Sequence, residues 1–376
     1  MSNARESRSA RTLVSLRPWF HGPESLHGQR AFKLPAYGPI YTSSALFHMP
    51  LFRLTLFLVL VALSGGPLSA RPYRIATTPW MGWAFLDVAE AKGFWKAEGL
   101  EVELKAYPDG TSYLDAQLAH LVDFSCGMVG DVVWIHAHRA PVRILLETDW
   151  SLGGDKFFLR RGQTLRNLKG RPVGYYQARY SLPFFLWKTL GKDYECIQAS
   201  PAAVFNPSDL LAQFRAGRLD MGVLCDPFLD ALGPEALIRC TSADIPGSLP
   251  ECFFTFQDVA QAMPARDLEG LVQGVLRAVA WMQDARNTEE LFRIVQARSY
   301  RQLPLRDVAD MRAQMRHAPT HGAELMWERN GPGMDGYLRE LRLFLRNYDP
   351  PAASYQPSEL FNADWTRHVL ATRGRR

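Results

Sequence analysis

The chain has 376 residues, of which 47% are hydrophobic, 22% are charged and 12% are aromatic, with a formal net charge of +5. This composition excludes a disordered or collagen-like chain and fits a globular protein with a sizeable core. Residues 1–70 hold seven Lys or Arg and two Asp or Glu, so the rest of the chain carries 36 charges of each sign and gives no support for nucleic-acid binding.

An apolar stretch near the N-terminus predicts an export signal. Residues 51–63 are apolar apart from Arg53 and Thr55, and they are too few for a membrane span, which needs about 20 residues. Gly65, Gly66 and Pro67 end the stretch, and Leu68, Ser69 and Ala70 supply small residues for a signal peptidase. The order positive, apolar, small is typical of a signal peptide, which we place at residues 49–70.

The same region suggests where translation starts. Met49 directly precedes the signal, so we interpret residues 1–48 as an over-extended N-terminus. The mature chain would begin at Arg71 and be located in the periplasm. An uncleaved signal anchor is the alternative.

Short strands and helices alternate along the first part of the mature chain. We expect helices that begin near Phe85, at 111–119 and at 131–138. The expected strands are residues 74–77, 100–104, 124–128 and 142–146.

The second part repeats this alternation and then becomes helical. The expected strands are residues 171–175, 196–199 and 221–224, and the expected helices are residues 182–190, 209–216 and 227–232. Beyond about Met263 the spacing of apolar residues predicts only helices, at 264–285, 288–299, 305–317 and 334–347.

Alternating strands and helices predict an α/β fold with helices on both faces of each sheet. Two such units, joined at residues 155–160 and near 236–256, indicate two lobes. Ligands of open α/β sheets bind beyond the carboxyl ends of the strands. In a two-lobed protein, both of these edges would face one cleft.

Motifs for common catalytic chemistry are missing. The sequence has no G-x-x-x-x-G-K-[ST], G-x-G-x-x-G, H-E-x-x-H or G-x-S-x-G segment. The pairs His136/His138 and His317/His321 lack a cysteine or carboxylate at ligand spacing, so we expect no metal and no cofactor. A binding protein without catalytic residues is therefore favoured over an enzyme.

Five cysteines remain in the mature chain, and none has zinc-ligand spacing. Export permits disulfides, and Cys240 and Cys252 flank a Pro/Gly-rich segment at residues 245–250 that a bond between them would close. The alternative is that all five cysteines are small buried apolar residues.

Several segments, in order, resemble one family. Residues 93–104, GFWKAEGLEVEL, resemble the "G-F-F-x-x-E-G-L-x-V" segment of exported binding proteins for nitrate, sulfonates, taurine and thiamine-type pyrimidines, which deliver solutes to ABC importers. Residues 149–155, DWSLGGD, and 168–174, LKGRPVG, resemble its "D-x-S-x-G-A-D" and "L-K-G-K-x-V-G". Residues 216–228 resemble "x-G-x-x-D-A…E-P-[FY]", with Met221 where Ala is commoner and Asp226 where Glu is commoner.

The resemblance implies a type II periplasmic-binding-protein fold with two α/β lobes, two crossover strands and a helical C-terminal extension. Lobe 1 would comprise residues 71–155 and 250–376, and lobe 2 would comprise residues 160–238. The implied partners are a small-molecule solute and an ABC-transporter permease in the inner membrane. We expect a monomer whose lobes close around the solute.

Candidate ligand contacts follow the ends of the expected strands, where aromatic and acidic side chains recur. They are Thr78, Trp80, Trp83, Asp131, Asp149, Trp150, Ser151, Tyr176, Gln177 and Asp226. Each has a structural alternative: one tryptophan belongs to the core, and Asp131 and Asp226 cap the helices that follow them.

Aromatic faces combined with carboxylates favour a cationic or amino-bearing heteroaromatic ligand, such as a thiamine-precursor pyrimidine. A small oxyanion (sulfonate, taurine or nitrate) is the alternative, because the helix that begins near Ser181 offers free N–H donors. Two further alternatives are a pyrimidine-synthase type of enzyme, whose Cys cluster we do not find, and the ligand-binding subunit of a sensor.

Overall fold

The computed structural model describes residues 71–108, 110–176, 179–198 and 200–372. These residues belong to one compact unit, Ser69–Arg376. The expected signal peptide at 49–70, the segment 1–48 and Gln177 lie outside the described residues.

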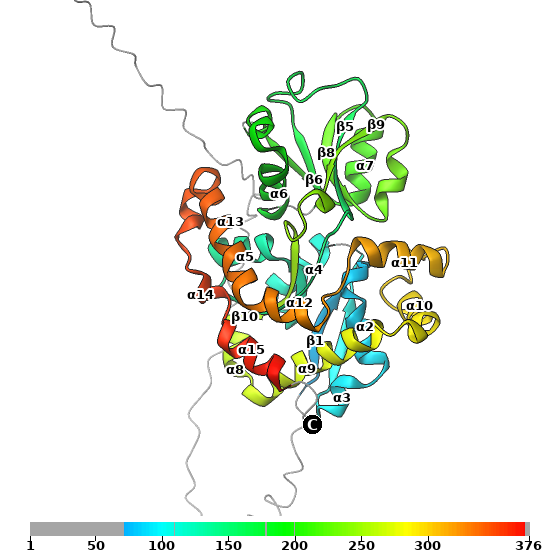
Figure 1. Cartoon of the computed structure of the whole chain (residues 1–376), viewed down its shortest axis with the longest axis vertical. Coiled ribbons are helices and arrows are strands. Elements are labelled where there is room, and N and C mark those ends of the chain that lie inside the picture. The colour runs from blue at the N-terminus through cyan, green and yellow to red at the C-terminus, as the bar shows by residue number, and fades with distance from the viewer. Residues whose placement is uncertain (1–70, 109, 177–178, 199, 373–376) are drawn as a thin grey trace, which may run out of the picture. The chain divides into compact units, whose positions relative to one another are not determined.

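Two five-stranded sheets organise the unit (Figure 1). The first sheet has the order β2-β1-β3-β10-β4. β1 pairs in parallel with β2 and β3, and β10 pairs antiparallel with β3 and β4. The strands are β1 Tyr73–Thr77, β2 Val102–Ala106, β3 Phe124–Met128, β4 Val142–Trp150 and β10 Pro250–Phe256.

The second sheet has the order β7-β6-β8-β5-β9 and repeats this plan. β6 pairs in parallel with β7 and β8, and β5 pairs antiparallel with β8 and β9. The strands are β5 Asp155–Arg160, β6 Val173–Tyr176, β7 Ala202–Phe205, β8 Met221–Cys225 and β9 Ala236–Thr241.

The chain crosses between the sheets twice, from β4 to β5 and from β9 to β10. In each sheet one central strand, β10 or β5, comes directly from a crossing and runs antiparallel to its neighbours. We call the first sheet with its helices lobe 1 and the second sheet with its helices lobe 2. The carboxyl ends of the parallel strands in both lobes lie close to these crossings, which determines the position of the site.

Helices of lobe 1 bury apolar faces against the first sheet and against each other. α9 packs on α2 and α3, where the buried Trp95 donates its indole N–H to the Leu271 carbonyl at 3.0 Å. These helices are α2 Ala84–Ala91, α3 Phe94–Ala97, α4 Gly110–Leu118, α5 Val129–His138, α8 Gln257–Ala262, α9 Ala265–Met282, α10 Thr288–Ala297, α11 Val308–His317, α12 Ala323–Glu328, α13 Met334–Tyr348, α14 Pro357–Leu360 and α15 Ala363–Ala371. The helical C-terminal region is therefore confirmed.

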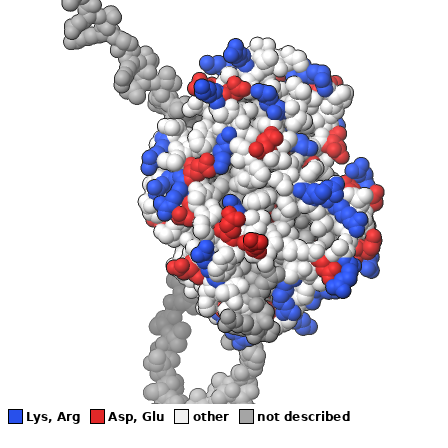
Figure 2. All heavy atoms as spheres, viewed as in Figure 1, with Lys and Arg blue, Asp and Glu red and all other residues white. Residues whose placement is uncertain are grey.

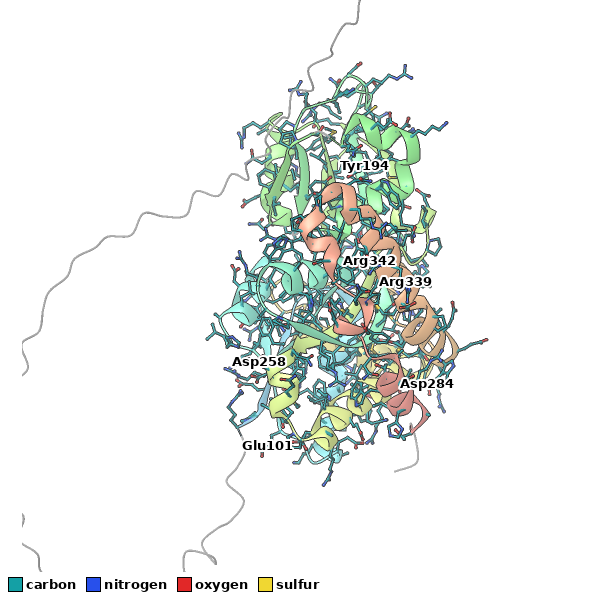
Figure 3. All side chains as sticks on the ribbon, turned by 90° about the vertical axis from the view of Figure 1, so that its left-hand side faces the viewer. Glu101, Tyr194, Asp258, Asp284, Arg339 and Arg342 are labelled. Atoms are coloured by element: carbon teal, nitrogen blue, oxygen red, sulfur yellow. The ribbon has the colours of Figure 1, made fainter. Side chains whose placement is uncertain are left out.

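Lobe 2 has the helices α6 Ser181–Leu190 and α7 Pro207–Arg215, and 3₁₀ turns at Gly191–Cys196 and Phe228–Leu232. α13 of the C-terminal region reaches α6, where the Phe344 ring lies 5.5 Å from Phe184 and 6.3 Å from Tyr194. Figure 3 shows this helix, which carries the labelled Arg339 and Arg342, extending to the region of Tyr194. The C-terminal helices thus contact both lobes.

Two predicted elements of lobe 2 are wrong. Residues 196–199 were expected as a strand, but the strand is β7, Ala202–Phe205, and the preceding residues form the 3₁₀ turn that ends at Cys196. β7 is an edge strand with no buried residue, so it lacks the apolar signal of a core strand. The expected helix at 227–232 is the 3₁₀ turn Phe228–Leu232.

The expected disulfide between Cys240 and Cys252 is not formed, and both thiols are free. Cys240 lies opposite Phe157 in the second sheet, whereas Cys252 lies opposite Gly127 in the first. The segment between them is the second crossing, so the two cysteines are held in different lobes. Both are buried, as the alternative interpretation expected.

The surface shown in Figure 2 carries Lys and Arg interspersed with Asp and Glu. None of the helices in the described part of the chain is long and apolar enough to span a membrane.

Candidate functional site

A pocket lies where the strand ends of both sheets meet, and it encloses about 560 Å³ of unfilled space, part of it open to solvent. Loops after β1, β2 and β3 contribute to it from lobe 1, and the ends of β6 and β8 contribute from lobe 2. The lining residues are Thr78, Pro79, Trp80, Trp83, Pro108, Met128, Tyr176, Pro207, Cys225, Asp226, Phe228, Glu251 and Leu303. This is the sheet edge where α/β proteins bind ligands.

Two tryptophans after β1 form an aromatic wall. Trp80 donates its indole N–H to Asp149 Oδ2 at 3.0 Å, and the Trp83 ring packs edge-on against Tyr113 with centroids 5.7 Å apart. A Cβ atom at Gly82, between them, would lie 1.8 Å from Asp149 Oδ2, so only glycine fits there. Asp149 is fully buried and orients Trp80 instead of lining the pocket.

Glu251 presents a buried carboxyl group to the pocket. It is 4% exposed, and it lies on β10 between Met128 of β3 and Asp149 of β4. Its Oε2 atom is buried without a hydrogen-bond partner among the described atoms. Burial, with the charges of Asp149 and Asp155 nearby, raises the pKa of Glu251 well above its ordinary value and favours the protonated form.

A second buried carboxyl group supports the lobe 2 side. Tyr176 lines the pocket, and its hydroxyl donates a hydrogen bond to Asp155, which is 1% exposed. Burial raises the pKa of Asp155 to about 6. Asp155 begins β5, opposite Cys225 of β8, and Tyr176 ends β6. The strands β5 and β6 thus hold the Asp155–Tyr176 pair behind the pocket wall.

Asp131 occupies the N-terminus of α6 in the other lobe. Its Oδ1 accepts hydrogen bonds from the backbone N–H groups of Arg179, Tyr180 and Ser181 at 3.1–3.2 Å. The Ser181 hydroxyl in turn accepts the Asp131 N–H at 3.1 Å. Asp131 therefore does cap a helix, but the prediction named the wrong one: it caps α6 and not α5, the helix to which it belongs. The free N–H donors that an oxyanion was expected to use are already bonded.

Asp226 follows β8, lines the pocket and forms an ion pair with lobe 1. Its Oδ2 lies 2.5 Å from His317 Nδ1 of α11, and its N–H donates to the Gly154 carbonyl at 2.9 Å. The 3₁₀ turn after it has no side-chain cap, so the alternative of a capping role is wrong. Asp226 therefore connects the two sides of the pocket.

Trp150 and Ser151 lie away from the pocket. The Trp150 ring packs against His321, with centroids 4.8 Å apart, and the Arg329 guanidinium lies 5.3 Å from its centroid. Ser151 Oγ lies 2.7 Å from Ser242 Oγ in the crossings. We predicted these two residues as ligand contacts because they follow the end of a strand. In the structure, Trp150 packs toward the C-terminal helices and Ser151 bonds within the crossings between the sheets.

The structure therefore brings part of the predicted set together. The predicted residues that line the pocket are Thr78, Trp80, Trp83, Tyr176 and Asp226. Asp149 supports the pocket through its hydrogen bond from Trp80, whereas the partners of Asp131 at the start of α6 do not line it. Sequence reasoning missed Glu251, although an acidic residue inside the apolar run PECFFTF was a usable signal.

No group of three or more His, Cys, Asp or Glu side chains in the described ranges is placed to hold a metal ion.

Residues 80–186 match the family model described as NMT1/THI5 like. The matched segment runs from the loop after β1 in lobe 1 to α6 in lobe 2. It includes three of the segments that carry the family resemblance, at residues 93–104, 149–155 and 168–174. A search of curated proteins finds no match to the chain.

Solved structures of binding proteins share the fold. The periplasmic nitrate-binding protein NrtA from Synechocystis PCC 6803 is 15% identical, with a TM-score of 0.58, over 81% of this chain and 89% of that one. The alkanesulfonate-binding protein SsuA from Xanthomonas axonopodis pv. citri is 15% identical, with a TM-score of 0.56, over 75% and 98%.

A third structure is the ligand-binding component of an ABC-type import system from Staphylococcus aureus, 12% identical with a TM-score of 0.61 over 80% of this chain and 99% of that one. At these identities the likeness concerns the fold. The type II periplasmic-binding-protein fold is thus confirmed.

Proposed function

We propose that this protein is the exported solute-binding subunit of an ABC importer and that it binds a flat, amino-bearing or cationic heterocycle. The fold, the NMT1/THI5-like match and the position of the pocket between two lobes support solute binding. The signal at residues 49–70 supports export to the periplasm. There the protein would act as a monomer and deliver its solute to a permease in the inner membrane.

The observation that carries the ligand class is the Oε2 atom of Glu251, buried in the pocket wall without a partner. An unsatisfied buried polar group costs about 1–3 kcal/mol, which a ligand N–H donor would offset. Trp80, Trp83 and Phe228 provide apolar faces on which a flat ring stacks. An aminopyrimidine combines a stacking ring with exocyclic N–H donors.

The same site disfavours a small oxyanion. None of the described lining residues is Lys or Arg. Sulfonate and nitrate sites require converging donors, and Asp131 occupies the N–H groups at the start of α6. An oxyanion would have to displace this carboxylate from a buried position.

A thermal-shift screen of the mature chain tests the proposal. 4-Aminopyrimidine at saturating concentration should raise the Tm, because binding to the folded state stabilises it by mass action, whereas methanesulfonate and nitrate should leave it unchanged. Glu251→Met, which removes both carboxyl oxygens, should weaken 4-aminopyrimidine binding at least about 10-fold, and the exposed control Glu235→Met should not. A Tm shift by the oxyanions alone would overturn the ligand class.

A further inference from the structure

A second cavity adjoins the first. It encloses about 1150 Å³ of unfilled space, partly open, and four residues line both cavities. These shared residues are Pro79, Pro108, Phe228 and Leu303. The second cavity extends from them between α2, the ends of β1 and β2, and the segment 297–303 that follows α10. The two cavities are thus adjacent and meet at these four residues.

Two polar side chains that line this second cavity are buried and unsatisfied. Asp87 of α2 has no exposed surface; its Oδ2 accepts hydrogen bonds from the hydroxyl and the N–H of Ser299, whereas Oδ1 has no partner among the described atoms. Thr77, at the end of β1, is 3% exposed, and its Oγ1 also lacks a partner. Both residues line the second cavity and neither lines the first.

The sequence around Asp87 makes it unusual. Its neighbours Phe85, Leu86, Val88 and Ala89 are fully buried and apolar, so this part of α2 is buried on every side and a carboxyl group there is costly. The bonds to Ser299 satisfy only one of its two oxygens. The other oxygen and Thr77 Oγ1 both lack a partner among the described atoms and belong to residues that line the cavity; we refer to these two atoms as the acceptor site.

The cations around this cavity leave that acceptor site open. Arg298 forms an ion pair with Glu90 of the same cavity, and Arg301 is exposed. Burial raises the pKa of Asp87, and the charge of Arg298 acts against this rise without a hydrogen bond to the carboxyl group. The buried wall therefore presents an acceptor with no bonded donor, whereas the positive groups are paired or lie at the surface.

We propose that the two cavities form one elongated binding site, in which Asp87 and Thr77 bind a primary amino group carried on a chain from the ring in the first cavity. The solute is then a heteroaromatic amine with an aminoalkyl extension. This inference rests on the proposed function, since the first cavity must hold the ring.

A pair of compounds that differ only at the end of the chain tests the proposal. The probes are 4-aminopyrimidine carrying a 3-aminopropyl group at C5 and the matched 3-hydroxypropyl compound, with binding measured by isothermal titration calorimetry. A hydrogen bond between an ammonium and a carboxylate is stronger than one to a hydroxyl, so the aminopropyl compound should bind the wild-type protein about 10-fold or more tightly.

Variants locate this preference. Asp87→Asn should reduce the affinity ratio of the two probes to near 1, and Thr77→Val should reduce it about threefold. The matched control Asp115→Asn, an exposed position on α4, should keep the wild-type ratio. If Asp87→Asn kept the wild-type ratio of affinities for the two probes, the proposal would be overturned.

If Asp87→Asn does not fold, binding of a third probe to the wild-type protein still tests the proposal. Replacing the terminal ammonium by trimethylammonium keeps the charge and removes the N–H donors, and should lose the 10-fold gain. Equal affinity of the aminopropyl and hydroxypropyl compounds would show that the second cavity holds water only. If neither compound binds, the proposed function fails, and this inference fails with it.

Discussion

Asp131 and Glu251 are both buried acidic residues near the carboxyl ends of strands, but their surroundings differ. Asp131, in the region between α5 and α6, accepts three backbone N–H groups from the other lobe. Glu251, in the pocket wall, has an oxygen atom with no donor among the described atoms. Burial is the same in both regions, and each carboxyl group keeps one oxygen without a partner among the described atoms. The difference is that the other oxygen of Asp131 accepts N–H groups from the start of α6, which stabilises the lobe contact, whereas Glu251 lines the pocket and is available to a ligand.

The two regions also differ in how firmly the lobes are connected. Along α6, whose start Asp131 contacts, Lys188 pairs with Glu340 of α13 at 2.6 Å, and the Tyr180 hydroxyl just before the helix donates to Asp349. At the pocket, the Asp226–His317 pair joins the lobes. We therefore expect substitutions in the first region to affect mainly folding stability and those in the second to affect mainly ligand affinity.

Asp131→Ala should give the largest effect on stability. Three N–H groups at the start of α6, two of them buried, would lose their acceptor, at about 1–3 kcal/mol for each buried group, with partial rescue by water. We expect the free energy of unfolding to fall by about 4 kcal/mol in urea denaturation. The exposed control Asp115→Ala should change it by less than about 0.5 kcal/mol. A fall of that small size in Asp131→Ala would remove the distinction between the two regions.

Asp155→Asn should alter the pH dependence of stability. Burial raises the pKa of Asp155 to about 6, above the ordinary 3.8 of the unfolded chain, so its contribution is present below about pH 4 and is lost as the pH rises through 6. The variant does not titrate, so its stability relative to wild type should rise by up to about 3 kcal/mol between pH 4 and pH 7. Urea denaturation across this range measures it, and a constant difference would contradict the assignment.

Trp80→Phe should give the smallest effect. The ring remains, but the hydrogen bond to Asp149 is lost, which we expect to cost about 1 kcal/mol of unfolding free energy. Because the ring is then less firmly oriented, affinity for 4-aminopyrimidine should fall about threefold. If Trp80→Phe reduced stability but left the affinity for 4-aminopyrimidine unchanged, Trp80 would contribute to folding and not to ligand binding.

The sequence was sufficient for the fold class and for residues that directly follow parallel strands. Trp80, Trp83 and Tyr176 line the pocket because the end of a strand fixes their position locally. Glu251 was missed because it lies on a strand that returns through the second crossing, so its place depends on non-local pairing with β3 and β4. Asp131 was assigned to the wrong helix for the same reason, since its partners lie in the other lobe. Local patterns do not encode either contact.

The unfolding of Glu251→Met, with and without 4-aminopyrimidine, tests the central claim most directly. Replacing an unsatisfied buried carboxyl group by an apolar side chain of similar size should raise the stability of the ligand-free protein by about 1 kcal/mol. The same change should abolish the increase in Tm that saturating 4-aminopyrimidine gives the wild-type protein. A less stable variant that still shows the full ligand-induced increase would contradict the role of Glu251 as the ligand's acceptor.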